Sequence, residues 1–233
     1  MNKGDSLGNR MKDYENVNRN YLTKRTPVIV RVDGRAFHTL TRKCEKPFDN
    51  RLIKAMVEAA TRVAQDMQGF KLAYVQSDEA SFLITDYDDV NTQGWFNYNL
   101  SKINSLSSSI MSVHFNHNFN YGNFGYFDSR AFNIPEKDIA NYFLWRSNDW
   151  SRNSLQMFAQ ANFSHKQLEG KKREDMHEML HGIGKNWATD LSPQERNGTF
   201  FRKETFSMEY LRDIKPNYEE IKGIVEQVLA DPI

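Results

Sequence analysis

The stretch VIVRVDGRAFH, residues 28–38, is the one around which the chain is organised. Its first five residues are mostly β-branched, which is typical of a buried strand. Asp33-Gly34 is a turn dipeptide, so the strand ends there. A strand that ends in a carboxylate, a glycine and a donor-rich loop is well suited to hold a metal ion and phosphates. Many strands end this way without any function, so the rest of the chain must decide between the two readings.

The residues that follow indicate a regular order of strands and helices. They predict a helix from Asp49 to about Gly69, strands over 70–76 and 80–85, a helix over 95–115 and a strand over 126–134. Only a few residues separate the second and third strands, which is typical of a hairpin. The order strand-helix-strand-strand-helix-strand predicts an α+β fold of the ferredoxin-like type, an antiparallel sheet with helices on one face.

The remainder of the chain is mainly helical. Helices are expected over 136–148, 151–162, 172–182 and 215–230, with a short β segment over 198–202. The polar residues 1–25 predict a short helix or an arm. We therefore expect a sheet domain over 1–134 with an N-terminal arm, and a helical part over 135–233 packed on it.

Composition and charge narrow the function classes. The net charge of the 233 residues is only +1, but residues 1–54 carry 13 Lys and Arg against 6 Asp and Glu. A basic N-terminal part suits a nucleotide or nucleic-acid ligand, although solvated basic surface is the commoner cause of such a bias. Cys44 is the single cysteine, so an intrachain disulfide is impossible. No apolar run resembles a signal peptide or a membrane span, which predicts a cytoplasmic protein without a membrane partner.

Acidic residues at two strand ends form the first candidate site. In a ferredoxin-like sheet the first and third strands are neighbours, so Asp33 is expected near Asp78 and Glu79. Carboxylates together with a backbone carbonyl are hard oxygen ligands that suit Mg²⁺ bound to substrate phosphates. Acidic residues at turns are, however, often only solvated.

The residues around these carboxylates resemble the tRNA-His guanylyltransferase family. The matching segments are VDGRAFH (32–38), KPFD (46–49), YVQSDEASF (74–82), Ser101-Lys102, FDSR (127–130) and Trp145-Arg146 with Asp149 and Asn153. The resemblance covers about residues 20–165. It implies a palm-like domain similar to that of ordinary polymerases, but one that adds nucleotides to a 5′ end in the 3′→5′ direction.

The resemblance also implies roles for individual residues. Asp33, the carbonyl group of Gly34 and Asp78 would bind two Mg²⁺ ions, and Glu79 would support this catalytic site. An ATP or GTP molecule would be held by Asp33, Gly34, Arg35, Ala36, Phe37, His38, Ser77 and Asp78. Lys46, Asp49 and Lys102 would contact a triphosphate or the activated 5′ end. The implied partners are tRNA, nucleoside triphosphates and further copies of the chain in a tetramer.

Two departures from the eukaryotic pattern affect the expected substrate. Tyr98-Asn99 stands where eukaryotic members have a pair of arginines, and residues 149–154 read DWSRNS where those members have an element that reads the tRNA-His anticodon. The bacterial and archaeal branch is the better match, which favours template-dependent repair of tRNA 5′ ends. The alternative is non-templated guanylyl addition to tRNA-His. Candidate RNA contacts are Arg152, Asn153, Lys166, Lys171, Lys172 and Arg173, although a solvated loop also explains the last four.

Other readings compete with this one. His177-Glu178-Met179-Leu180-His181 is a literal H-E-x-x-H, the helical zinc motif of metalloproteases. Trp187 stands where a third histidine would belong, so the third ligand would have to be Glu195 or Glu204. His114-x-x-His117 is a possible metal pair that a helix end also explains. A non-catalytic RNA-binding module would have no need for both Asp33 and Asp78.

Overall fold

The computed structural model describes residues 6–120, 122–204 and 207–230. Its centre is a six-stranded antiparallel sheet in the order β4-β1-β3-β2-β5-β6. The strands are β1 (Val28–Arg35), β2 (Phe70–Gln76), β3 (Glu79–Ile84), β4 (Tyr126–Asn133), β5 (Thr199–Lys203) and β6 (Met208–Leu211). The first four follow the predicted order along the chain, and the prediction of an α+β fold is confirmed.

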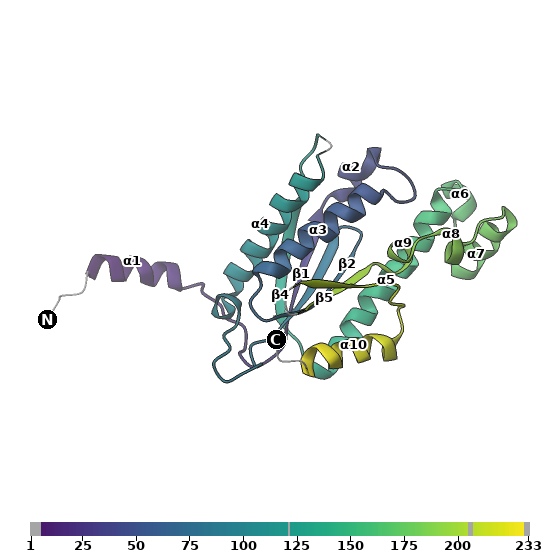
Figure 1. The fold of residues 1–233 in the computed structure, drawn as a ribbon. Coiled ribbons are helices and arrows are strands. Elements are labelled where there is room, and N and C mark those ends of the chain that lie inside the picture. Colours follow the sequence, from purple (N-terminus) through teal and green to yellow (C-terminus); the bar gives the residue numbers. More distant parts are fainter. Residues whose placement is uncertain (1–5, 121, 205–206, 231–233) are drawn as a thin grey trace.

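Two antiparallel helices cover one face of the sheet (Figure 1). They are α3 (Asn50–Asp66) and α4 (Leu100–Asn118). Asp49 caps α3, as predicted, by accepting a hydrogen bond from the backbone NH of Arg51. Val28, Val30 and Val32 of β1 lie in the same core as the apolar stripe of α3, so the alternation in VIVRV places these valines on this face of the sheet.

The opposite face of the sheet is also covered, which the sequence analysis did not predict for the sheet domain. Helices α5 (Ile139–Gln160) and α10 (Tyr218–Ala230) pack there on Ile29, Leu72, Tyr74 and Leu83. Every residue of β2 and of β3 is buried. The nearly continuous apolar runs of these strands fit burial on both faces.

The C-terminal part contributes strands as well as helices. β5 pairs with β2, and β6 extends the sheet beyond β5. The prediction of two helices over 136–148 and 151–162 is wrong, because α5 is one continuous helix. β6 was not predicted. Beyond the C-terminal half of α5 lie the short helices α6 (His165–Leu168), α7 (Arg173–Gly182), α8 (Trp187–Asp190) and α9 (Pro193–Asn197) (Figure 1).

The N-terminal arm contains helix α1 (Ser6–Asn16), which projects away from the rest of the molecule (Figure 1). Residues 1–5 of the expected arm lie outside the described residues. The remaining short elements are α2 (Phe37–Leu40) and the 3-10 turns η1 (Thr41–Lys43), η2 (Trp95–Tyr98) and η3 (Glu136–Asp138).

In the three described ranges, no helix combines the length and the apolar character needed to cross a membrane.

Candidate active site

The C-terminal end of β1 and the β2–β3 hairpin meet at one end of the central strands of the sheet. The register of the sheet pairs Asp33 of β1 with Glu79 of β3, and Ser77-Asp78 forms the tight turn before Glu79. Ser77 has φ 49°, the left-handed conformation that such turns require. The backbone NH of Gly34 donates to the carbonyl oxygen of Asp78 at 2.9 Å. The structure therefore brings Asp33, Gly34 and Asp78 together from two distant segments.

Gly34 permits the close approach of these two segments. A Cβ atom at this position would lie 2.9 Å from the Cβ atom of Asp78 and would also meet the ring of Phe37. Any side chain would therefore push the hairpin turn away from the end of β1. This contact explains why a glycine follows Asp33.

A cavity of roughly 460 Å³ opens beside this junction, a size that suits a small organic ligand. Among the predicted nucleotide-binding residues, its lining includes Gly34, Ala36, Phe37, His38, Lys46, Asp49, Ser77 and Asp78. Its apolar walls come from α3 and α5, where Leu52, Met56, Trp150 and Met157 contribute. The cavity thus combines apolar walls with polar groups from the hairpin turn and the loop after β1.

The loop after β1 forms one side of this cavity. Ala36 adopts the left-handed conformation (φ 55°) and turns the chain into α2. The ring of Phe37 is buried and packs against Phe115 and Phe127 with centroid distances of 5.2 and 5.1 Å. Arg35 and His38 are exposed. Phe37 thus anchors the loop while its neighbours remain accessible to a ligand.

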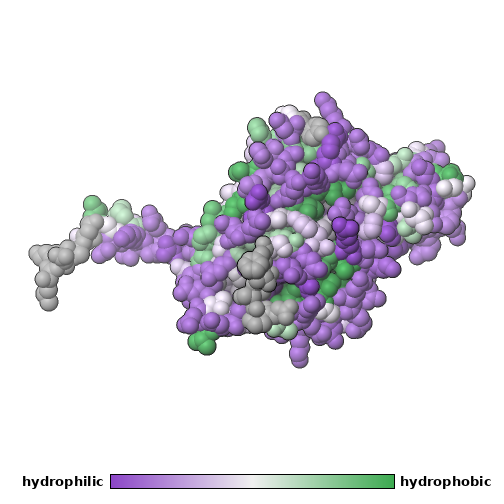
Figure 2. Space-filling model, in the orientation of Figure 1, coloured by the Kyte–Doolittle hydropathy of each residue, from purple (hydrophilic) through white to green (hydrophobic). Residues whose placement is uncertain are grey.

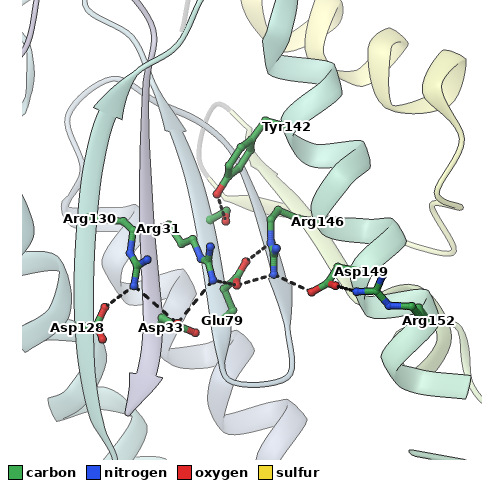
Figure 3. Close-up of polar contacts among 10 residues, drawn as sticks. Arg31, Asp33, Glu79, Asp128, Arg130, Tyr142, Arg146, Asp149 and Arg152 are labelled. Carbon is green, nitrogen blue, oxygen red and sulfur yellow. Dashed lines mark hydrogen bonds and ion pairs between the residues drawn. The ribbon is translucent and has the colours of Figure 1, made fainter. Parts of the chain in front are cut away.

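Glu79 is held by two arginines behind the candidate metal site (Figure 3). Arg146 of α5 donates from Nε and Nη2 to the two carboxylate oxygens at 2.7 and 2.8 Å, and Nη2 of Arg31 lies 2.7 Å from Oε2. Burial raises the pKa of Glu79, and the charges of Arg146 and Arg31 oppose that rise. Both carboxylate oxygens of Glu79 are bound by arginines, so the arrangement fits a residue that holds the strand ends in place.

The ion pairs of Asp33 are longer than that between Arg31 and Glu79. Its Oδ2 atom lies 3.6 Å from Arg31 and 3.9 Å from Arg130, and its side chain is 32% exposed. Figure 3 shows these contacts as one chain of charges that runs from Asp128 on β4 to Arg152 on α5. Because the arginine contacts of Asp33 are longer than hydrogen bonds, the carboxylate keeps the capacity to bind a cation.

The electrostatics of Asp78 support the same conclusion. Burial raises the pKa of Asp78, and the negative charge of Asp33 adds to this rise. A cation bound between the two carboxylates would relieve both effects. The described residues contain no group of three or more His, Cys, Asp or Glu that could hold a metal ion. Two carboxylates and a carbonyl group fit Mg²⁺, which usually fills its other positions with water and phosphate oxygens.

Lys46 and Asp49 lie on the loop that borders the cavity. The ammonium group of Lys46 is exposed, and Nζ donates to the carbonyl oxygen of Thr41 at 3.4 Å. The carboxylate of Asp49 is buried and accepts two hydrogen bonds from the guanidinium group of Arg51, at 2.8 and 2.6 Å. These bonds hold the pKa of Asp49 well below its usual range. In the structure Asp49 thus holds the loop and caps α3.

The structure does not bring Lys102 to this site. It lies in the first turn of α4, with Nζ 6.0 Å from the centre of the Phe96 ring. The other end of α4 is the one near the cavity, because Asn116 hydrogen-bonds the backbone of Gly125 just before β4. Ser107, more than one helical turn further along α4, hydrogen-bonds Ser129 of β4, which pairs with Val32. Lys102 thus lies before the level of Asp33 on α4 and does not line the cavity.

The candidate RNA contacts lie along α5 and beyond its C-terminal end (Figure 1). Arg152 is exposed and pairs with Asp149, and Asn153 is half-buried on the same helix. Lys166 on α6, Lys171, Lys172 and Arg173 at the start of α7 are all exposed. These residues lie outside the lining of the cavity beside Asp78.

The zinc motif has no third ligand in the part of the chain that the structure describes. The ring of His177 instead packs edge-on against Trp187, with centroids 6.0 Å apart. Burial lowers the pKa of His177, and His181 is exposed. His114 and His117 lie in a separate groove with Glu58 and Arg62. Neither histidine pair forms a metal site here.

Sequence reasoning missed Arg31 and Arg146, the two arginines that bind Glu79. Arg31 stands between valines in a buried strand, and a charge at such a position signals a buried partner. Arg146 lies in a segment that resembles the family, but the resemblance assigned no role to this residue. The walls of the cavity from α5, such as Trp150 and Met157, carry no local signal, since only the tertiary packing brings them to the hairpin.

An antiparallel sheet with two carboxylates at the ends of neighbouring strands and a cavity of nucleotide size beside them suits a nucleotidyltransferase. A family model described as tRNAHis guanylyltransferase matches residues 8–135, more than half of the chain. The chain belongs to this family.

Solved structures and a curated relative agree with this assignment over nearly the whole chain. A bacterial tRNA(His) guanylyltransferase-like protein in complex with ATP is 43% identical with a TM-score of 0.87, and the match covers 96% of this chain and 98% of that one. A bacterial tRNA(His) guanylyltransferase-like protein in complex with GTP is 41% identical with a TM-score of 0.84, covering 97% and 100%. The tRNA(His) guanylyltransferase of Schizosaccharomyces pombe is 27% identical, covering 94% of this chain and 89% of the relative.

Proposed function

We propose that this chain adds nucleotides to the 5′ end of tRNA in the 3′→5′ direction, and that it does so as template-dependent repair of truncated 5′ ends. The observation that carries the proposal is the junction of Asp33, Gly34 and Asp78 beside the cavity, which Gly34 and Asp78 line. Similarity to proteins solved with ATP and with GTP supports a nucleoside triphosphate as the ligand of the cavity. Non-templated guanylyl addition to tRNA-His is the alternative.

The proposed reaction has two steps. In the first, an oxygen of the RNA 5′ monophosphate attacks the α-phosphorus of ATP or GTP, and pyrophosphate leaves. In the second, the 3′ hydroxyl group of the incoming nucleotide attacks the activated 5′ phosphorus, and the nucleoside monophosphate leaves. Each step exchanges one phosphoester or phosphoanhydride bond for another, so positioning and charge stabilisation are the main tasks of the protein.

The proposed roles follow the geometry of the site. When bound at Asp33, the Gly34 carbonyl group and Asp78, two Mg²⁺ ions would supply charge stabilisation to the attacking and leaving oxygens. The loop from Arg35 to His38 and Ser77 would hold the triphosphate, and Lys46 would add a positive charge at the rim of the cavity. Glu79, fixed by Arg31 and Arg146, would keep the ends of β1 and β3 in register.

The larger assembly is part of the same proposal. Residues 1–134 would form a palm-like catalytic domain, and 135–233 would pack on it. The exposed cations of α5, α6 and α7 would contact tRNA phosphates, which position RNA without reading its sequence. The functional form would be a homo-tetramer.

The test is incorporation of a labelled nucleotide into a 5′-truncated, 5′-phosphorylated tRNA. We expect the added nucleotide to change when the opposing base of the acceptor strand is changed. If guanosine is added whatever the opposing base, the repair reading is wrong and the non-templated alternative holds. If the 5′ end is never extended, the proposed function is wrong.

A further inference from the structure

A second cavity of roughly 360 Å³ adjoins the candidate active site and has a different character. Its lining consists of Thr39, Leu40, Arg42, Lys43, Cys44, Arg51 and Asn123. Three of these side chains are cationic, and among the described residues that line it none is acidic. Cys44 lines both cavities, so the second one begins where the first ends.

The cations of this cavity are held in place by the local backbone. Arg42 and Lys43 lie on η1, where the hydroxyl group of Thr41 donates to the carbonyl oxygen of Phe37 at 2.8 Å. The buried carboxylate of Asp49 fixes the guanidinium group of Arg51. Arg51 stands in the first turn of the 17-residue helix α3, whose N-terminus adds positive potential.

Two of the three cations have no acidic partner. Arg42 and Lys43 are exposed, and neither forms an ion pair within the part of the chain that the structure describes. Glu45 and Asp49 line the first cavity, not the second. An ordinary solvated surface usually intersperses both signs of charge, whereas these cations converge on one hollow.

We propose that this basic cavity is a phosphate-binding site that extends the nucleotide cavity, an inference that rests on the proposed function. Guanidinium groups match the oxygens of a phosphate, and a lysine adds a point charge. The phosphate can come from the tail of a nucleoside triphosphate seated in the first cavity or from the backbone of an RNA whose 5′ end lies at Asp33 and Asp78. Both sources present the same chemistry to the cavity.

The test removes the two unpaired charges and measures binding. The double variant Arg42→Gln/Lys43→Gln is compared with Lys54→Gln/Arg62→Gln, which removes two exposed cations from the outer side of α3. The probes are inorganic triphosphate, ATP and a short 5′-phosphorylated single-stranded RNA, titrated into the full chain by calorimetry. The charge-conserving variant Arg42→Lys/Lys43→Arg shows whether the altered loop still folds and binds.

We expect Arg42→Gln/Lys43→Gln to weaken at least one probe by about tenfold, while the control pair changes binding little. If ATP and inorganic triphosphate are weakened and RNA is not, the site holds the triphosphate tail. If RNA is weakened and ATP is not, the site holds the RNA backbone. In that case the slope of log K against log salt should also fall by about 0.7 for each RNA phosphate that the variant no longer neutralises.

The proposal is overturned if the two double variants lose equal affinity, because general charge then explains the binding. It is also overturned if neither variant changes the binding of any probe. Binding is measured without turnover, so its outcome is separate from that of nucleotide incorporation. A chain that binds phosphate here but never extends an RNA contradicts the proposed function and leaves this site standing.

Discussion

Glu79 and its two arginines illustrate how single residues support the site. The side chains of Glu79 and Arg146 are 5% and 7% exposed, so this ion pair is almost fully removed from water. A buried pair of this kind adds little net stability, but removing one partner leaves an uncompensated buried charge. The function of the pair is therefore to fix positions, since Glu79 stands opposite Asp33 in the sheet.

The variant Arg146→Ala tests this reading. We expect it to lower the free energy of unfolding by about 3 kcal/mol, because Glu79 then retains only Arg31. The matched control is Arg152→Ala, which removes an exposed partner of the same Asp149 and should cost less than about 1 kcal/mol. Denaturant unfolding of both variants gives the comparison. Equal losses of unfolding free energy in the two variants would show that the buried pair of Glu79 and Arg146 has no special role.

A second prediction concerns the contribution of Asp49 to stability and its dependence on pH. Arg51 keeps the pKa of Asp49 below its ordinary value of 3.8, so the ionised carboxylate stabilises the folded state. This stabilisation is complete above pH 3.8 and is lost as the pH falls below it, because the folded state then resists a proton that the unfolded chain accepts.

Asp49→Asn should therefore lower the free energy of unfolding by about 1 kcal/mol at neutral pH. The difference between variant and wild type should shrink when both are unfolded below pH 3.8. The control is Asp66→Asn at the exposed C-terminal end of α3, where no such difference is expected. A difference that stays constant with pH would mean that the charge of Asp49 is irrelevant.

At the scale of elements, the strands and helices with strong periodicity were predictable from the sequence. β1, α3, β2, β3 and β4 lie within a few residues of their expected ranges, because each carries a local pattern of apolar residues. The junction of Asp33 and Asp78 followed from the strand order. The strands and helices depend on neighbouring residues in the sequence, and the junction depends on the rule that the first and third strands of a ferredoxin-like sheet are neighbours.

The elements that were not predicted depend on contacts between distant residues. A break was expected between residues 148 and 151, yet α5 is continuous there, and Arg146 of this helix binds the buried carboxylate of Glu79 from another segment. β6 is a short edge strand of only four residues, too short for a clear alternation. Lys102 matched a motif by sequence, but it does not line the cavity, and a motif alone does not say which residues a cavity exposes.

At the scale of the whole molecule, α1 is the exception to a compact body. It projects from the rest of the chain and contains no buried residue (Figures 1 and 2). Leu7, Met11 and Tyr14 form an exposed apolar stripe on it. An isolated helix of 11 residues is marginal in water, and burial of this stripe would stabilise it. In the proposed tetramer, a second copy of the chain would bury it.

The prediction is that alanine at Leu7, Met11 and Tyr14 reduces the assembly, because the variant loses the apolar surface that a second copy would bury. Alanine at Asn9, Asp13 and Asn16, on another face of the same helix, serves as the control. Light scattering coupled to gel filtration measures the mass of each. If both variants keep the mass of the wild type, α1 does not contribute to assembly.

The proposal that Asp33 and Asp78 together form the catalytic site is the one on which the proposed function depends. Its most direct test is Mg²⁺-dependent incorporation of labelled nucleotide into a 5′-truncated, 5′-phosphorylated tRNA by the wild type, Asp33→Asn and Asp78→Asn. Thermal unfolding of each variant establishes that the fold is intact. We predict that either substitution lowers the rate of incorporation by about a thousandfold. A folded variant that extends the tRNA at the wild-type rate would contradict the account.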